Sequence, residues 1–179
     1  LDRVLDPNGN ITRYYYVKET NRYSKLGNSS WPIAYTSGGL LDRIEYGAQS
    51  GSEASFGQQV VFDRQYRCTA LNSTCVNPPG PNSPQNTDLI CPINTVCSES
   101  APSFFDTKRL AGVTTKALKG ASWKTVDSYA FTHTWLNPTG SIPQLWLNKI
   151  QRTGVDGTAT KNQRPVLFDG TAYANRADS

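Results

Sequence analysis

The sequence predicts an all-β fold, either an antiparallel β-sandwich or an extended β-sheet, with a long disulfide-stapled loop. Apolar and polar residues alternate with period two in several segments, and clusters of Gly, Pro, Asn and Asp separate these segments. No window of ten or more residues shows convincing helical periodicity. Hydrophobic residues make up only 37% of the chain, but nine Tyr, six Phe and four Trp supply large apolar surfaces. We therefore expect one folded β-domain over residues 1–179.

The first segment predicts a β-hairpin. Residues 1–5 alternate in polarity, residues 6–10 are turn formers, and residues 11–17 are rich in β-branched and aromatic side chains. Asn8-Gly9 is a strong hairpin signal because both residues tolerate positive φ. We therefore expect two antiparallel strands joined at this turn.

Further strands are predicted along the rest of the chain. Residues 18–30 read as a polar stretch and residues 47–57 as a loop of small residues, both between strands. The segments with strand signals are residues 40–46, 58–67, 108–118, 123–136, 145–152, 164–168 and 171–174. The turn signals between them suggest a sandwich or an extended sheet.

The four cysteines lie in one 30-residue window, within a loop expected at residues 68–103. They are Cys68, Cys75, Cys91 and Cys97. Zinc ribbons favour Cys-x-x-Cys pairs, whereas these pairs are separated by six and five residues. The Pro/Asn-rich loop between them gains most from covalent closure, so we expect two disulfides in an oxidising compartment. Three connectivities are open, and Cys68–Cys75 with Cys91–Cys97 is the simplest.

Candidate catalytic groups are sparse. His133 is the single histidine, and a histidine within a Thr-His-Thr strand is more often a cross-strand pair position than a base. No Gly-x-Ser-x-Gly elbow occurs. The carboxylates near strands show no pairing in the sequence; they are Glu45, Asp63, Asp106 and Asp127. We expect no enzymatic activity and no cofactor.

An oxygen-rich segment that begins at Asp6 superficially resembles a calcium loop. A loop of the EF-hand type needs a bidentate Glu at its twelfth position, and that position is Val17. We therefore expect a turn at Asp6 and no metal site.

Two segments resemble the YD repeat of Rhs-type proteins. Residues 1–16 read LDRVLDPNGNITRYYY, similar to a strand, a D-x-x-G-N turn and an x-x-Y-x-Y strand, and residues 39–47 resemble a truncated copy. The rest is similar to the β-rich segment beside the YD repeats of large secreted actinobacterial Rhs proteins. The matching stretches are residues 60–68 (VVFDRQYRC), 102–110 (PSFFDTKRL), 131–136 (FTHTWL), 145–150 (LWLNKI) and 175–179 (NRADS).

This resemblance implies a structural role. YD repeats resemble strands that spiral into a hollow β-shell, and this chain holds at most two repeat-like units. Within the single domain, residues 1–47 would form YD-repeat-like hairpins and residues 58–179 the main sheet with the cysteine loop. We expect a non-catalytic structural or interaction module that packs on or extends the shell. Its partners would be other segments of the same Rhs polypeptide.

The aromatic residues leave a second function open. Tryptophan and tyrosine side chains on a β-sheet offer stacking platforms for sugar rings, although a Trp in a β-protein poor in aliphatic residues is more often part of the core. The candidate ligand surface comprises Trp31, Trp123 and Tyr15. The alternative is therefore a carbohydrate-binding β-sandwich that anchors the parent protein to polysaccharide or cell wall.

The charge pattern limits the other partners. The net charge is +4, and the charges are scattered without a run of Lys or Arg, so we expect no nucleic acid partner. No apolar stretch approaches the length of about 20 residues that spans a bilayer, so we expect no membrane insertion. The chain contains no Met, which indicates a mature product or a fragment. Together with the cysteines, this predicts a secreted or cell-surface location.

Overall fold

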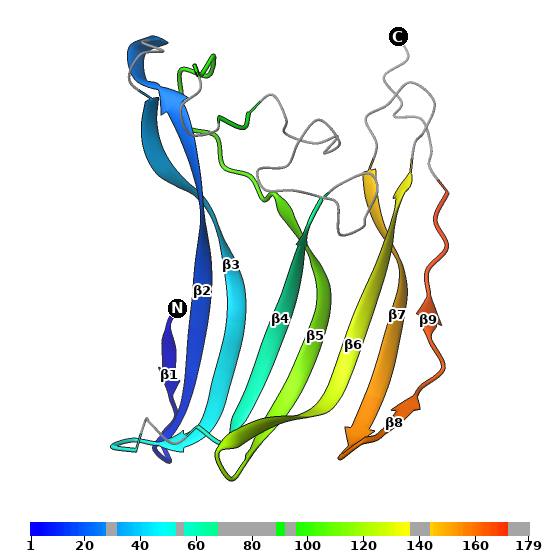
Figure 1. Cartoon of the computed structure of the whole chain (residues 1–179). Helices are drawn as coiled ribbons and strands as arrows, with labels where there is room; N and C mark the ends of the chain where they lie inside the picture. The colour runs from blue at the N-terminus through cyan, green and yellow to red at the C-terminus, as the bar shows by residue number, and fades with distance from the viewer. Residues whose placement is uncertain (28–31, 53–55, 68–88, 92–95, 137–143, 172–179) are drawn as a thin grey trace.

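The computed structural model describes residues 1–27, 32–52, 56–67, 89–91, 96–136 and 144–171. They form one antiparallel β-sheet in which the strands follow each other in chain order (Figure 1). A short 3-10 turn, η1 (Lys25–Gly27), follows the second strand. The strands are β1 (Arg3–Leu5), β2 (Asn10–Ser24), β3 (Pro32–Gln49), β4 (Gln58–Tyr66), β5 (Lys108–Lys119), β6 (Ser122–Leu136), β7 (Gln144–Asp156), β8 (Ala159–Asn162) and β9 (Val166–Leu167).

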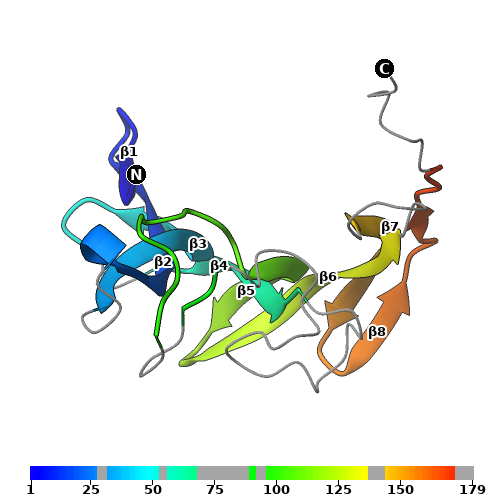
Figure 2. The ribbon, with the colours of Figure 1, turned by 90° about the horizontal axis from the view of Figure 1, so that it is seen from above.

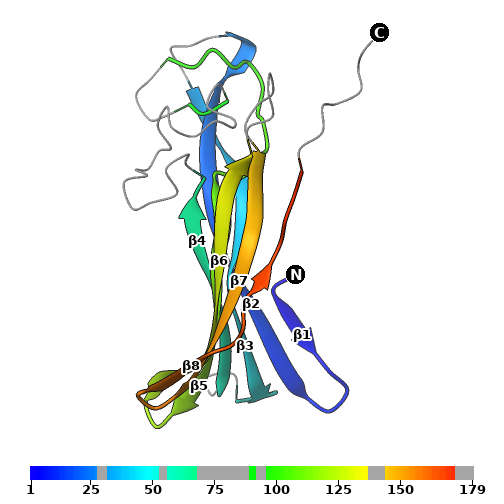
Figure 3. The ribbon, with the colours of Figure 1, turned by 90° about the vertical axis from the view of Figure 1, so that its right-hand side faces the viewer.

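The architecture is a meander with a divided last edge. Strands β1 to β8 pair in sequence order, while β9 pairs with β7 beside β8. Seen from the side, the strands lie in one curved layer (Figure 3), and the view from above shows the sheet undulating from β1 to β8 (Figure 2). The all-β antiparallel prediction is confirmed as an extended sheet, and the sandwich alternative is wrong because the described strands all belong to one sheet.

The first long hairpin departs from the sequence prediction. We expected residues 18–30 to lie outside strands, yet β2 continues to Ser24 and β3 already begins at Pro32. The polar residues of this stretch pair in the ladder because both sheet faces offer water or polar partners rather than a hydrophobic core. The expected strand at residues 171–174 falls largely outside the described residues, and β8 was not predicted.

The turn between β1 and β2 confirms the hairpin but not its expected geometry. Gly9 donates its amide to the Asp6 carbonyl (3.0 Å), and only Gly9 in this turn has positive φ (+83°). Asp6 Oδ1 accepts the amides of Asn8 (2.9 Å) and Asn10 (2.8 Å). Hydrogen bonds, chiefly from the Asn10 side chain, hold the pKa of the Asp6 carboxyl below its usual value. The oxygen-rich segment is therefore a turn, as predicted.

Little apolar surface is buried anywhere in the described sheet. A small buried cluster of Ile11, Ala48 and Phe56 lies where β2 begins and β3 ends. The chain exposes 12064 Å², whereas a globular monomer of 19.7 kDa exposes about 8,600 Å². Among the described residues only six hydrophobic side chains are buried, namely Ile11, Ala48, Phe56, Cys91, Cys97 and Ala111, so the sheet lacks a core of ordinary size.

Both faces of the sheet carry the same mixture of side chains. One cross-strand row comprises Tyr15, Arg43, Val61, Thr114, Ser128, Thr153 and Asn162. The opposite face carries the row Tyr14, Ile44, Val60, Thr115, Asp127, Gly154 and Lys161. In each row only the residue on β8 is fully exposed, and the others are half-buried. Neither face is therefore the inside of a self-contained core.

The close approach of β5 and β6 generates the first prediction. A Cβ at Gly112 would lie 2.8 Å from the Tyr129 carbonyl oxygen, so the backbone must shift to admit it. We expect Gly112→Ala to lower the free energy of unfolding by about 1–3 kcal/mol in urea titrations. The control is Gly39→Ala, where a Cβ has open space within 4 Å and a change within about 1 kcal/mol is expected. Equal losses in the two variants would contradict this reading of the β5–β6 spacing.

Candidate functional site

The most elaborate side-chain arrangement holds a strap against the sheet. The strap is defined as residues 89–91 and 96–107, which belong to the connection between β4 and β5. Instead of passing directly between these neighbouring strands, it reaches β2 and β3 at the upper end of the sheet (Figure 1). Buried polar side chains from both strands bind its backbone, so hydrogen bonds fix its path.

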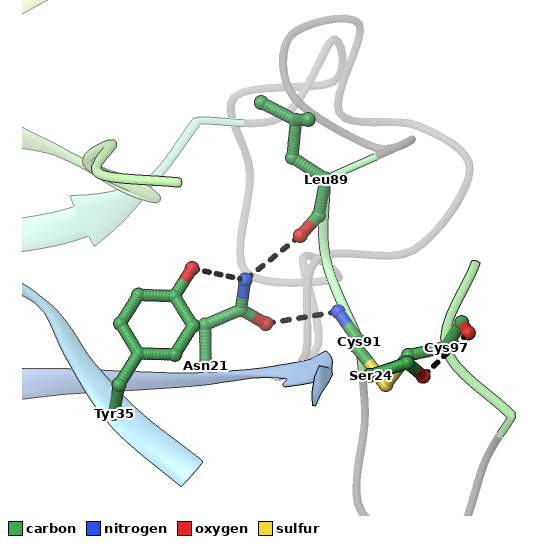
Figure 4. Close-up of a disulfide and its surroundings, with 6 residues drawn as sticks. All are labelled: Asn21, Ser24, Tyr35, Leu89, Cys91 and Cys97. Atoms are coloured by element: carbon green, nitrogen blue, oxygen red, sulfur yellow. Dashed lines mark hydrogen bonds between the residues drawn. A yellow bond between two sulfur atoms is a disulfide. The ribbon is translucent and has the colours of Figure 1, made fainter. Parts of the chain in front are cut away.

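Asn21 is the central anchor of the strap (Figure 4). Its side chain is 6% exposed, donates from Nδ2 to the Leu89 carbonyl (2.8 Å) and the Tyr35 hydroxyl (3.1 Å), and accepts the Cys91 amide at Oδ1 (2.9 Å). A buried amide is tolerated only when such partners satisfy it. Asn21 therefore sets the position of the strap on β2.

Ser24 and a disulfide hold the next part of the strap. The Ser24 hydroxyl donates to the Cys97 carbonyl (2.7 Å), and its amide donates to the Glu99 carbonyl (2.8 Å). Cys91 and Cys97 are buried and disulfide-bonded, with Cα atoms 5.6 Å apart. The disulfide links Cys91, whose amide Asn21 binds, to Cys97, whose carbonyl Ser24 binds. It therefore holds both backbone groups close to β2. The predicted Cys91–Cys97 pair is confirmed; Cys68 and Cys75 lie outside the described residues.

Tyr35 and Glu19 fix the end of the strap. The Tyr35 hydroxyl donates to the Ser103 carbonyl (2.5 Å) and accepts the Ser103 amide (2.9 Å). The buried Glu19 carboxylate accepts the amide (3.2 Å) and the hydroxyl (2.5 Å) of Thr107. Gly38 allows the close approach, because a Cβ there would lie 3.1 Å from Asp106 Oδ1 and 3.3 Å from the Phe105 carbonyl.

A cavity of about 280 Å³ lies between the strap and the sheet. Its lining combines strap residues, such as Phe105, with side chains from β2, β3 and the end of β4. The charged lining residues are Lys18, Glu19 and Lys108. Burial, followed by the nearby Glu19 charge, raises the pKa of the lining residue Tyr66. The cavity wall therefore combines polar and apolar surface, and the tethered strap shapes it.

His133 belongs to a second polar cluster, centred on a buried arginine. Arg109 is 8% exposed; its Nη2 donates to Gln65 Oε1 (2.7 Å) and its Nη1 lies 3.2 Å from His133 Nδ1. A guanidinium only donates, so Nδ1 accepts and the imidazole is neutral. Burial, then the charges of Arg109 and Arg67, lower the pKa of His133, against an opposing hydrogen bond with the Phe131 backbone.

The candidate carboxylates do not converge. Burial opposes ionisation of Glu45, but hydrogen bonds from Arg43, Tyr15 and Gln59 outweigh it and lower its pKa. Asp127 accepts a bidentate ion pair from Arg152 (3.0 and 3.1 Å) on another part of the sheet. Among the described residues, no group of three or more His, Cys, Asp or Glu side chains is arranged to hold a metal ion.

The predicted ligand surface is not assembled into one patch. Tyr15 lies on β2 with the Arg43 guanidinium 3.7 Å from its ring centre, so one ring face is covered. Trp123 lies at the start of β6, with three strands between it and β2. Trp31 lies outside the described residues. The anchors Glu19, Asn21 and Ser24 were not predicted, because they lie in the stretch 18–30 that the sequence marks as polar and outside strands.

The fold and the site define the chain as an open, single-layer antiparallel β-sheet with a strap tethered at one end. No protein-family model matches the chain, and no curated protein matches it. Solved structures do match: the crystal structure of TcdB2-TccC3-TEV at a TM-score of 0.53, and those of TcdB2-TccC3 without the hypervariable C-terminal region and of TcdB2-TccC3-Cdc42 at 0.52. Each is 14% identical over 92% of this chain and 8% of that chain. The shared property is the fold.

The Asn21 anchor generates the second prediction. We expect Asn21→Ala to lower the free energy of unfolding by about 1–3 kcal/mol, because it leaves the Cys91 amide and the Leu89 carbonyl without their partner. Hydrogen exchange of residues 96–107 should also accelerate. The neighbouring Thr20→Ala, at an exposed position of the same strand, is the control. Unchanged exchange in Asn21→Ala would show that the strap is held without this side chain.

The His133 cluster generates the third prediction. The folded state binds a proton at His133 less readily than the unfolded state, so acidification below the ordinary histidine pKa of 6.5 favours unfolding. The contribution is present above pH 6.5 and is lost as the pH falls toward the lower folded pKa. We expect His133→Gln to show a shallower loss of stability between pH 7 and 5 than the wild type, measured by urea unfolding. Identical slopes would contradict the neutral imidazole, since the chain has no other histidine.

Proposed function

We propose that this chain is a non-catalytic structural segment of a larger β-shell. The observation that carries the proposal is the single layer, half-exposed on both faces, with more surface than a compact protein of its mass. Antiparallel sheets in isolated domains usually cover one face with a core. A sheet that covers neither face suits the wall of a hollow assembly, which is the role that the Rhs/YD-repeat resemblance implies.

The structural neighbours support a segment rather than a complete protein. This chain spans 8% of each TcdB2-TccC3 chain that it matches. At 14% identity the likeness concerns the fold, so the activity of those proteins is not transferred. In the proposed role, the chain contributes wall and connections, and its partners are other segments of its own polypeptide.

The two edges of the sheet supply the surfaces for such partners. In the described part of the chain, β1 covers only the start of β2, and no strand lies outside β8 and β9. Exposed apolar side chains lie along both edges, at Tyr16 and Val17 on β2 and at Val166 and Leu167 on β9. Open edges template pairing with further strands. We propose that neighbouring strands of the parent cover them.

The side-chain contacts of the described residues bear on catalysis, location and ligand binding. The contacts of His133 and Glu45 with arginines suit structural roles, which supports a non-catalytic chain. The buried Cys91–Cys97 disulfide supports a secreted or cell-surface location. Among the described residues, no helix has the length and apolar character to cross a membrane. The polysaccharide-binding alternative gains no support, because Tyr15 and Trp123 lie apart and Arg43 covers one of them.

Photo-crosslinking in the full parent protein tests the shell proposal. A benzophenone amino acid would replace Leu167 on the β9 edge or Tyr16 on the β2 edge, and mass spectrometry would map the crosslinks. We expect both probes to join other segments of the same polypeptide, while a probe at Leu26, 92% exposed beside the β2–β3 turn, serves as control. Edge probes that react no more than Leu26 would contradict the proposal.

A further inference from the structure

The hairpin that joins β5 and β6 extends beyond its neighbours in the sheet. We call residues 116–126 the finger. On one side, β4 begins opposite Ala117; on the other, β7 pairs with β6 only from Asp127 onward. The finger lies at the lower end of the sheet in Figure 1, and Figure 3 shows this end turned away from the β1–β2 hairpin. β4 still pairs with Lys116 and Ala117, and the Leu118 amide donates to the Gly57 carbonyl (2.9 Å), so the ribbon projects beyond β4 at its tip and has no pairing strand on the β6 side among the described residues.

The finger is tightly built at its tip. Lys119 pairs with Ser122 across the two-residue turn Gly120-Ala121, and Gly120 has φ +63°. A glycine of positive φ at the first central position is the signature of a type II′ turn, whose twist suits a hairpin. Isolated two-stranded ribbons are marginally stable in water. Residues 122–126 therefore lack the support of a second neighbouring strand among the described residues.

Three lysines give the finger a concentrated positive charge. Lys116, Lys119 and Lys124 lie within nine residues that contain no acidic residue. Within the described part of the chain, the ammonium group of none of the three forms an ion pair or hydrogen bond. The acidic residues at its base are Asp127, which is paired with Arg152, and Asp156 at the end of β7. Against a net charge of +4 for the chain, the finger carries +3.

The same ribbon presents an apolar pair on the face of Lys116, while Lys119 and Lys124 lie on the opposite face. Leu118 lies directly opposite Trp123, and Lys116 lies opposite Thr125, so these four residues share one face. Leu118 is 41% exposed, and Trp123 is partly exposed. Tryptophan and lysine both combine an apolar body with a polar end, which suits a boundary between apolar and aqueous phases.

The residue types favour a lipid surface over other anionic partners. Lysine is depleted at protein–protein interfaces, and bidentate recognition of phosphates and nucleic acids uses arginine, which the finger lacks. Ammonium groups act as point charges, which suits a diffuse anionic surface. Leu118 adds nothing to the stacking of sugar rings, but it adds to the apolar contact that an amphipathic element makes with acyl chains.

We propose that the finger is a peripheral docking element for anionic phospholipid surfaces. Lys116, Lys119 and Lys124 contact the headgroups, and Leu118 and Trp123 enter the boundary between headgroups and acyl chains. The finger adsorbs to the surface without spanning the bilayer. This role goes beyond the shell function, because it assigns the protruding end of the sheet a partner outside the polypeptide.

Vesicle cosedimentation of the full 179-residue chain tests this inference. The vesicles are phosphatidylcholine alone or phosphatidylcholine mixed with phosphatidylglycerol. We expect binding to the mixed vesicles only, weakening as salt rises. The variant Lys116→Gln, Lys119→Gln, Lys124→Gln should bind roughly 100-fold more weakly. The matched control removes the same charge at the exposed residues Lys25, Lys161 and Arg164, each replaced by Gln, and should bind within a few fold of the wild type.

Four results would overturn the proposal. They are absence of wild-type binding to the mixed vesicles, equal binding to neutral vesicles, equal losses in the two triple variants, and capture by acidic polysaccharides or proteins without vesicle binding. Surface substitutions of lysine or arginine by glutamine preserve the fold, and far-ultraviolet circular dichroism of both variants checks this. A second variant, Trp123→Phe, should keep most of the binding, since an aromatic ring remains at the boundary.

Discussion

The structure depends on the cross-strand hydrogen-bond ladder of one sheet. In most domains of this length, burial of apolar side chains supplies the main favourable free energy. Here few apolar side chains of the described residues are buried, and the strands are long and paired along much of their length. The ladder satisfies the backbone of the inner strands but leaves the outermost ones open at both edges. A sheet held by its ladder explains the large exposed surface, and its open edges are the reason for the neighbouring strands that we propose.

The strap encloses a second interior against the sheet, apart from the small Ile11 cluster. That interior is polar: Glu19, Asn21 and Ser24 replace the apolar side chains that ordinarily point inward. Hydrogen bonds confer direction, so they fix the path of a loop more narrowly than apolar contacts do. The Cys91–Cys97 disulfide joins the two backbone segments that these side chains bind. Covalent and polar constraints therefore stabilise this connection, together with the edge-on contact between Phe104 and Tyr35.

Much of the fold could be predicted from residue patterns, and the failures have physical causes. The alternation in β4 to β7 and the turn at Gly9 placed most strands, because those signals are local. The continuation of β2 through residues 18–24 was not predicted. A polar stretch indicates a loop only in a protein whose strands cover a hydrophobic core, and this sheet covers none of ordinary size. The anchors depend on contacts with residues about 70 positions away, for which a single sequence carries no signal. Likewise, the sequence did not indicate that the pairing of Leu118 with Trp123 places Lys116, Lys119 and Lys124 on one hairpin.

Hydrogen exchange measured on this chain alone and within its full parent protein tests the central claim most directly. The account predicts that amides of β4, β5 and β6 are protected in both, because neighbouring strands of the chain itself cover them. It also predicts that the outer half of β2 and the strands β8 and β9 become protected only in the parent. Equal protection of those edges in the isolated chain and in the parent would contradict the claim that the sheet is one segment of a larger wall.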